Sequence, residues 1–488
     1  MRLKVQVIIE SGAGETEVVQ EVAKLERQSM RPESLGLTLS EAKALLQDVQ
    51  NAMVTHQSTE YVTQHLACPE CGRIRSQKGQ HQIVFRTLFG TVRLDSPRLY
   101  QCGCCGNEAP RSFSPLAALL PERTAPELAY LETKFAALIS YGLTVELLAE
   151  VLPTGGDINV AGVYRNVQRV AKRMEAELGE EQWHFIEGCQ RDWDALPPPG
   201  PPITVGLDGG FVHAKAQKSR GEGWFEVIAG KSVPEEGAAK CFAYVQTYDP
   251  KPKRRLFELL KSQRLQANQQ VTFSSDGAED VRELPLYLSP ESEHWLDWFH
   301  VTMRLTGMGQ LAKGLANEQA EGPKTAAPAG PPDEASEETV GAGDIGKQLE
   351  RLKWFLWHGN VERALETIED IEGALDLLSQ DGQSRRKLVK ALREFSGYIE
   401  ANQNFIPNYG DRYRHGETIS TAFAESTVNL VVSKRMVKKQ QMQWSEPGAH
   451  HLLQVRTKVL NDEFRETFAR WYPGMRTDQE TNLAEKAA

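Results

Sequence analysis

The sequence of 488 residues predicts a multidomain α/β protein. Three observations support this prediction: a cysteine-rich segment with strand-like alternation, a helical segment with a basic face, and a series of apolar strands after a proline-rich linker. A chain of this length exceeds the size at which single hydrophobic cores stop growing, so we expect several domains.

The composition predicts a soluble, cytoplasmic chain without membrane contact and leaves DNA binding open. No run approaches the ~18 consecutive apolar residues of a membrane span, and the N-terminus has too short an apolar core for a signal peptide. The net charge of −10 argues by itself against contacts with phosphates. However, seven acids against one lysine give residues 315–346 a local charge of −6. We interpret that Pro-, Ala- and Gly-rich tract as a disordered acidic loop.

The first 66 residues are predicted to form an N-terminal helical region. A short strand, LKVQVII, precedes a helix for which Ser40 is the expected N-cap. Apolar residues recur on one face of that helix, and no pattern in this region indicates chemistry.

A zinc-ribbon-like β module is predicted for residues 67–115. Two cysteine pairs flank two or three strands, which turn near Gly90 and at Ser96–Pro97 and would bring the pairs together. Four thiolates on two tight turns are a ligand set that Zn²⁺ favours. The expected ligands are Cys68, Cys71, Cys102 and Cys105. Cys104 is an alternative to either of its cysteine neighbours, and free cytosolic thiols are the alternative to a metal site.

Residues 116–190 are predicted to form a helical, DNA-binding region. Two helices that separate at Tyr141–Gly142 precede a third, INVAGVYRNVQRVAKRME. A helix-turn-helix that reads DNA and an ordinary helical hairpin with a solvated basic face both explain this pattern. The basic face of the third helix consists of Arg165, Arg169, Lys172 and Arg173.

Residues 203–310 are predicted to form the first part of an α/β core with carboxylates at its strand ends. Three strands, a helix and a fourth strand follow one another, which is the order of a ribonuclease-H-like sheet. The first and fourth strands are neighbours in such a sheet, so Asp208 and Asp276, which end them, would lie side by side. Adjacent carboxylates repel unless cations neutralise them, and their oxygens suit Mg²⁺. For each Asp alone, a turn residue in an Asp-Gly step is the alternative.

The segment HWLDWFH is predicted to contain a fifth strand and the start of the following helix. It carries Asp297 and His300 with two residues between them. A lone histidine is more often structural than functional, but this one follows a strand whose neighbours end in carboxylates. The glycines after Asp208 and Asp276 allow another part of the backbone to approach closely.

These segments resemble the Asp-Asp-Glu transposases of bacterial insertion sequences, most closely the ISKra-type group and more broadly the Mutator and hAT transposases. The matching segments are VGLDGGFVHAK, EVIAGK, FSSDGAEDV, DWFH and AFAESTVNLVVSKRM. The resemblance implies a third carboxylate on a downstream helix, which falls on Glu425, whereas an acid favoured by the helix dipole is the simpler explanation. It also implies a place for His300 near the scissile phosphate or the flanking bases, with Asp297 orienting it or the strand end.

The resemblance further implies how the remaining residues divide. A helical insertion would cover residues 311–415, including the acidic loop 315–346, and the C-terminal part of the core would cover residues 416–465, before a tail at 466–488. Basic residues that follow Glu425 on its helix are candidates for phosphate contacts, although exposed cations are often only solvated. They are Lys434, Arg435, Lys438 and Lys439.

The sequence therefore predicts a DNA transposase that cleaves and joins DNA by two-metal-ion phosphoryl transfer. Asp208, Asp276 and Glu425 would hold two Mg²⁺ or Mn²⁺ ions, and the Zn²⁺ would be structural. The expected partners are double-stranded DNA, at the terminal inverted repeats and at the target, and further copies of the chain. Two alternatives remain: a ribonuclease-H-like nuclease without joining activity, and a catalytically idle, transposase-derived DNA-binding regulator.

Overall fold

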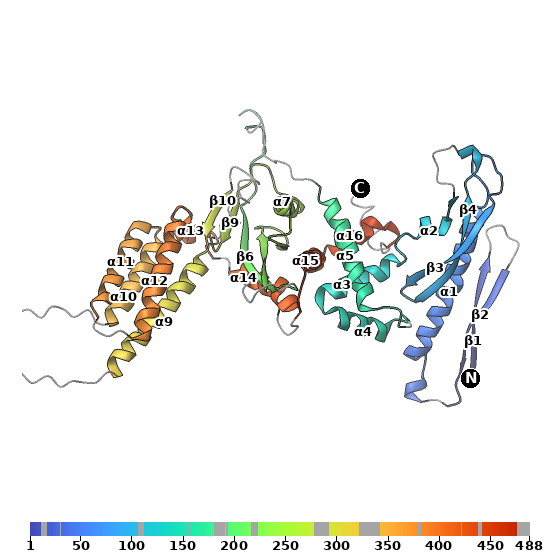
Figure 1. Ribbon diagram of the computed structural model, residues 1–488, viewed down its shortest axis with the longest axis horizontal. Coiled ribbons are helices and arrows are strands. Elements are labelled where there is room, and N and C mark those ends of the chain that lie inside the picture. The colour runs from blue at the N-terminus through green and yellow to red at the C-terminus, as the bar shows by residue number, and fades with distance from the viewer. Residues whose placement is uncertain are drawn as a thin grey trace, which may run out of the picture. The chain divides into compact units, whose positions relative to one another are not determined.

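The computed structural model describes residues 1–10, 17–29, 31–105, 112–154, 156–179, 191, 194–215, 223–277, 292–321, 342–378, 382–420, 422–437 and 442–475. They belong to two compact units, one made of residues 1–175 and 451–488 and the other of residues 176–450. Figure 1 labels the elements of both units. None of the helices in the described ranges has an apolar stretch long enough to cross a membrane.

The first unit begins with an antiparallel β-hairpin, where the sequence predicts a single strand. The hairpin consists of β1 (Arg2–Glu10) and β2 (Glu17–Glu26), and α1 (Leu39–Gln64) packs against β2. The helix begins two residues earlier than predicted, because Thr38, not Ser40, is its N-cap. The Thr38 hydroxyl accepts a hydrogen bond from the Glu41 backbone N–H, and the Glu41 carboxylate accepts one from the Thr38 N–H, so two otherwise unpaired donors are satisfied.

A three-stranded antiparallel sheet follows α1 within the same unit. It contains β3 (Gln77–Thr87), β4 (Gly90–Tyr100) and β5 (Ser112–Phe113) in that order, and α2 (Pro115–Leu119) packs on β4. The predicted turn near Gly90 is present, whereas the turn predicted at Ser96–Pro97 is wrong because β4 continues through it. Since β5 pairs only with Leu99 and Tyr100, Pro97 costs β4 no hydrogen bond on that edge.

The helical segment of the first unit has the three predicted helices, and a fourth from the C-terminal part of the chain packs with them. These are α3 (Pro126–Leu138), α4 (Tyr141–Val151), α5 (Val160–Glu177) and α16 (Phe464–Trp471). The Tyr130 ring contacts Phe464 and Phe468 of α16, with ring centroids 5.4 Å apart in both cases. Residues 451–475 therefore belong to this unit and not to the C-terminal part of the core, and the part of the predicted tail from 476 to 488 lies outside the described residues.

The second unit contains a five-stranded mixed sheet with the order β10-β9-β6-β7-β8. Its strands are β6 (Ile203–His213), β7 (Trp224–Val233), β8 (Lys240–Val245), β9 (Val271–Ser275) and β10 (Glu293–Leu296). The three N-terminal strands form an antiparallel meander, and β6 pairs with β9 in parallel, so the predicted neighbours are adjacent. One detail of the prediction is wrong: β6 does not end at Asp208 but runs on to His213.

The two faces of this sheet pack against different helices. On one face, the apolar side chains of β6 and β9 form a core with Leu256 and Leu260 of α7 (Pro252–Ser262). On the other face, α14 (Ala422–Val428) packs on β6 and β7, and its helical path continues as the π-helix η5 (Asn429–Val437). The face that carries Asp208 is therefore covered by the helix that carries Glu425.

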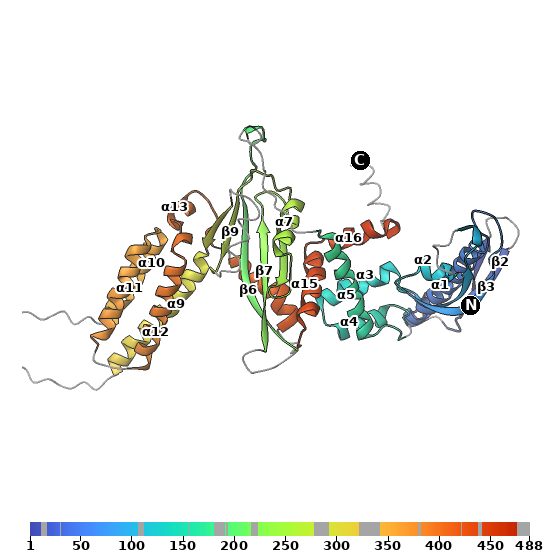
Figure 2. The same cartoon turned by 45° about the horizontal axis from the view of Figure 1, so that its top comes forward.

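A helical bundle inserted between β10 and α14 completes the second unit (Figure 2). Its helices are α9 (Trp298–Glu321), α10 (Ala342–Trp357), α11 (Val361–Asp376), α12 (Gln383–Ala401) and the short α13 (Tyr409–Arg414). The acidic loop predicted at 315–346 is shorter than expected, because residues 315–321 and 342–346 are helical; residues 322–341 lie outside the described part of the chain. Leu315 and Ile345 at those helix ends are fully buried in the bundle core.

Candidate functional site

Three aspartates lie in line just beyond the point where the parallel pairing of β6, β9 and β10 ends. In the register of β6 and β9, Gly206 lies beside Ser274, so two residues further on Asp208 lies level with Asp276, on the same face. In the register of β9 and β10, Leu296 lies beside Ser275, so the next position places Asp297 level with Asp276. A backbone hydrogen bond of 2.8 Å from Asp297 N–H to the Ser275 carbonyl continues that pairing.

The Asp208 carboxylate interacts electrostatically with other predicted site residues. Its pKa is raised above the ordinary value, mainly because burial removes solvent from the carboxylate, and further because of the negative charges of Asp276 and Glu425. The charge of His300 and a 2.8 Å hydrogen bond from the Gly209 backbone N–H act in the opposite direction. Asp208, Asp276, Glu425 and His300 are therefore close enough to interact electrostatically, although they come from four separate segments.

Glu425 reaches this site because α14 lies directly on β6. A Cβ atom at Gly210 would lie 2.9 Å from Cγ1 of Val428, so glycine is required for the strand and helix to approach this closely. Glu425 lies in the first turn of α14 and is exposed, whereas Ala424 and Val428 are buried against the sheet. The charge of Glu425 is one of the causes of the raised pKa of Asp208, an effect that the dipole of a short helix does not require.

Asp297 is the N-cap of α9, a more specific role than the orienting role that the resemblance implies. It is 1% exposed, and its Oδ1 accepts a 2.9 Å hydrogen bond from the Phe299 backbone N–H, as an N-cap does at the start of α9. The Asp297 carbonyl accepts a hydrogen bond of 3.1 Å from the His300 N–H. Asp297 thus fixes the first turn of α9 at the end of β10, and that turn carries His300 to Asp208. The predicted strand HWLDWF is correspondingly shorter, since α9 begins at Trp298.

Side chains of the helical insertion hold the strand ends that carry Asp276 and Asp297. The hydroxyl of Tyr398 on α12 donates a 2.9 Å hydrogen bond to the Asp276 carbonyl, and the hydroxyl of Tyr409 donates one of 2.7 Å to the Leu296 carbonyl. Burial is the main reason that the pKa of both phenols lies above the ordinary value, so both hydroxyls stay protonated and donate.

A third contact of this kind involves Gly277, directly after Asp276. Its φ of +89° favours glycine, and a Cβ atom there would lie 2.4 Å from Oδ1 of Asn402. Asn402 in turn donates a 2.8 Å hydrogen bond to the Tyr398 carbonyl. No sequence pattern points to Tyr398, Tyr409 or Asn402, because each lies in or beside an ordinary amphipathic helix.

The donor chemistry of the carboxylate site fits hard divalent cations. Asp208, Asp276 and Glu425 offer carboxylate oxygens, which are the ligands of Mg²⁺ and Mn²⁺. Within the ranges that the structure describes, these three carboxylates do not form a group whose ligand atoms all lie within 4.8 Å of one another.

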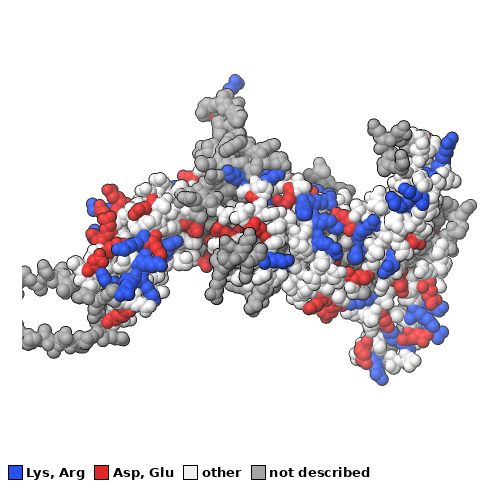
Figure 3. Space-filling model, in the orientation of Figure 1, with Lys and Arg blue, Asp and Glu red and all other residues white. Residues whose placement is uncertain are grey.

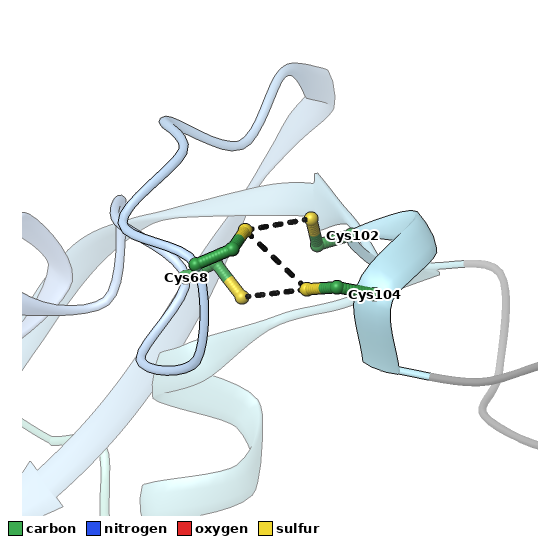
Figure 4. A group of neighbouring side chains, drawn as sticks. Cys68, Cys102 and Cys104 are labelled. Atoms are coloured by element: carbon green, nitrogen blue, oxygen red, sulfur yellow. Dashed lines mark hydrogen bonds between the residues drawn. The ribbon is translucent and has the colours of Figure 1, made fainter.

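The first unit contains a second candidate metal site, which consists of cysteines. The Sγ atoms of Cys68, Cys71, Cys102 and Cys104 all lie within 4.8 Å of one another. Sulfur–sulfur distances are 3.5 Å for Cys68 and Cys104, 3.4 Å for Cys71 and Cys102, and 3.3 Å for Cys71 and Cys104. Figure 4 shows the sulfur atoms of the turn after α1 facing those of the short helix after β4. Four thiols grouped this closely fit a tetrahedral Zn²⁺ ion.

The local backbone explains how each half of this cluster forms. After α1, the Gly72 N–H donates to the Cys68 carbonyl and the Cys68 N–H to the Arg73 carbonyl, both at 2.9 Å, so the chain makes a tight turn. After β4, the Cys104 backbone N–H is the main cause of a lowered pKa at Cys102, which favours its thiolate form. In this group of four, Cys104 takes the place predicted for Cys105, which is the alternative that the spacing allowed. The side chain of Cys105 lies outside the described part of the chain.

The basic residues predicted to contact DNA divide into two groups. Arg169 pairs with Glu122 at 3.5 Å, and the guanidinium of Arg173 lies 4.2 Å from the ring centroid of Trp471, so both stabilise the first unit internally. The other two residues of that face, Arg165 and Lys172, are exposed.

After Glu425, Lys434 is exposed, but Arg435 is fully buried next to the Trp444 ring and cannot serve as a surface contact as predicted. Lys438 and Lys439 lie outside the described residues.

Comparison with known proteins adds no relative for this chain. No family model matches the sequence, and no curated protein is significantly similar to it. The functional conclusion therefore depends on the residues and on the geometry of the two sites.

The raised pKa of Asp208 predicts how stability depends on pH when divalent cations are absent. Because the native carboxyl holds its proton more tightly than the unfolded one, stability falls as the pH rises from the ordinary Asp value through the raised one. We expect Asp208→Asn to raise the melting temperature in EDTA at pH 7 by roughly 1–3 °C. The difference from the wild type should shrink toward pH 4 in thermal melts. A melting temperature that is lower for the variant at pH 7 would contradict the assignment.

Proposed function

We propose that this protein is a DNA transposase with a ribonuclease-H-like catalytic core, which cleaves DNA and joins the ends to a target. The observation that carries the proposal is the convergence of Asp208, Asp276 and Glu425 from β6, β9 and α14 at one end of a mixed sheet with the order β10-β9-β6-β7-β8. Carboxylates that repel one another destabilise the fold unless cations neutralise them. Their proximity therefore supports a cation site.

The chemistry assigns a role to each residue of the site. The three carboxylates would hold Mg²⁺ or Mn²⁺, and two such ions supply charge stabilisation for the attacking and leaving oxygens of a phosphoryl transfer. Water and then a DNA 3′-hydroxyl are the successive nucleophiles in this proposal. His300, carried on the first turn of α9, is placed to contact the scissile phosphate, and Asp297 is a positioning residue that fixes that turn.

Charge distribution on the insertion supports a role in DNA binding. Lys and Arg gather on the visible side of the α9–α12 bundle, at the left of Figure 3. In sequence, α12 has five cations against two acids, whereas α11 has six acids against one arginine, so the bundle is electrostatically polarised. Four of the α12 cations are exposed, namely Arg386, Lys387, Lys390 and Arg393, of which Lys390 lies 3.7 Å from Glu394 and Arg393 lies 3.5 Å from Glu372. DNA that leaves the carboxylate site along α9 would follow the basic side.

The cysteine module and the helical region would recognise the terminal inverted repeats. The proposed Zn²⁺ would hold the strands of the cysteine module in place. Arg165 and Lys172 on α5 are exposed and could contact phosphates. Transposition also brings two DNA ends together, which requires further copies of the chain.

A strand-transfer assay tests this function. The full-length protein would be incubated with duplexes that carry the sequences flanking its coding region, a supercoiled target, and Mg²⁺, Mn²⁺ or EDTA. Joined products with either metal and none in EDTA support a transposase. Cleavage without joining would identify a nuclease, and binding without chemistry in any metal would identify a DNA-binding regulator.

The contact of Tyr398 with Asp276 gives a prediction for metal affinity. Tyr398→Phe removes one hydrogen bond to a carbonyl that adjoins a proposed ligand, a net loss of about 1 kcal/mol. We expect the Mn²⁺ concentration for half-maximal cleavage to rise roughly fivefold, with little change in activity at saturating Mn²⁺. Tyr413→Phe is the matched control, because Tyr413 is a tyrosine of the same insertion that is 64% exposed. An equal shift in both variants would refute a specific role for Tyr398.

A further inference from the structure

The N-terminal hairpin has an edge strand without a partner. Its sheet contains β1 and β2 alone among the described residues, so β1 has one edge that pairs with no described strand, and α1 packs against β2. The one register shift lies opposite Val5 and Gln6, where β2 has an additional residue, so β1 itself is a regular strand of nine residues. An edge of this length without proline or bulge is a template for pairing with another strand.

The sequence of β1, RLKVQVIIE, is complementary to itself when two copies run antiparallel about Gln6. Arg2 then lies opposite Glu10 of the second copy, which pairs opposite charges at both ends of the strand. Leu3 lies opposite Ile9, and Val5 lies opposite Val7, so apolar side chains meet on the same face. Lys4 lies opposite Ile8, which its methylene chain can cover. Opposite-charge and aliphatic cross-strand pairs each stabilise a sheet.

Exposed apolar surface surrounds the same edge. Ile8 is 58% exposed, although it lies in the middle of a strand. A hollow of about 480 Å³ lies beside Leu3, and four of its ten lining residues are leucines: Leu3, Leu25, Leu35 and Leu37. In the antiparallel arrangement, Ile9 of the second copy lies next to Leu3, at the rim of this hollow. The partner strand would therefore cover apolar surface that the single chain leaves in water.

We infer that β1 pairs with β1 of a second copy of this chain, giving a four-stranded sheet across a two-fold axis at Gln6. The interface is isologous, as in most homodimers, so each favourable pair occurs twice. The inference rests on the first unit alone and does not depend on the carboxylate site. It predicts that the protein is a dimer without DNA or metal.

Disulfide trapping tests the axis directly. Directly opposite residues of an antiparallel pair have Cβ atoms about 4.5–5.5 Å apart, close to the spacing that a disulfide needs. We expect full-length Gln6→Cys to form a covalent dimer under mild oxidation. Gln20→Cys is the matched control, because Gln20 is an exposed glutamine on β2, away from the proposed axis. Equal cross-linking of the two variants would overturn the arrangement.

Charge reversal tests the register in solution. We expect Arg2→Glu to weaken the dimer about tenfold in sedimentation equilibrium, since it opposes two like-charged pairs. Glu10→Arg should do the same, and the double variant Arg2→Glu/Glu10→Arg should return to near the wild-type dissociation constant. A wild-type chain that stays monomeric at about 50 μM, far above the dissociation constants of specific dimers, would overturn the inference. So would a dimer that neither single variant weakens.

Discussion

Asp208→Asn and Glu425→Gln should each abolish cleavage and joining in the strand-transfer assay, with rates reduced about a thousandfold or more. Each substitution removes one negative charge and one oxygen ligand from the site, while it preserves the shape of the side chain. Asp208 contributes from the central strand and Glu425 from the helix that packs on it, so neither can compensate for the other. A thousandfold loss corresponds to about 4 kcal/mol of transition-state stabilisation.

The control for this experiment is Glu235→Gln. Glu235 is an exposed acid after the end of β7, so the same loss of charge should leave the rate unchanged. DNA binding by all three variants should stay near that of the wild type, because the carboxylates are not contacts for the repeats in the proposed function. Activity that survives Glu425→Gln would mean that a different acid completes the site.

The adjacency of the strands that carry Asp208 and Asp276 could be predicted from sequence, whereas the choice of Glu425 depends on the resemblance. Strand periodicity and the order of strands and helix were sufficient to make the first and fourth strands neighbours, and the structure has them adjacent. The end of β6 was misplaced for a physical reason: the two glycines after Asp208 resemble a turn. In the structure they lie within the strand, and Gly210 gives room for Val428 of α14.

Features that depend on distant packing could not be predicted in this way. No local pattern shows that Phe464 and Phe468 pack on Tyr130, more than three hundred residues earlier. Likewise, the basic pattern at Arg435 gives no sign of its burial beside Trp444. The N-cap role of Asp297 is easier to predict from sequence, since an aspartate directly before a helical segment commonly marks the start of a helix.

Zinc removal is expected to have the largest effect on folding. The residues that connect the cysteine pairs include the whole of β3 and β4, whose core is small: Ile83, Val92 and Leu94 pack with Leu116 and with side chains of α1. Structural Zn²⁺ contributes about 10–16 kcal/mol in small zinc-binding peptides, far more than a core of this size. We expect one zinc per chain by elemental analysis, and rapid amide exchange in β3 and β4 after chelation, while β6 and β7 stay protected.

Serine substitutions decide which thiols bind the metal. Cys68→Ser and Cys104→Ser should each reduce the zinc content and expose β3 and β4 to exchange, because their sulfur atoms belong to the group of four. Cys105→Ser is the closest control for Cys104→Ser, and Cys241→Ser, in a strand of the second unit, controls for loss of a buried thiol elsewhere. If Cys105→Ser lost zinc and Cys104→Ser kept it, the ligand predicted from spacing would be right and the grouping in the structure wrong. If the wild type held no zinc, the cysteines would be free thiols, and the stability of the module would depend on its hydrophobic core alone.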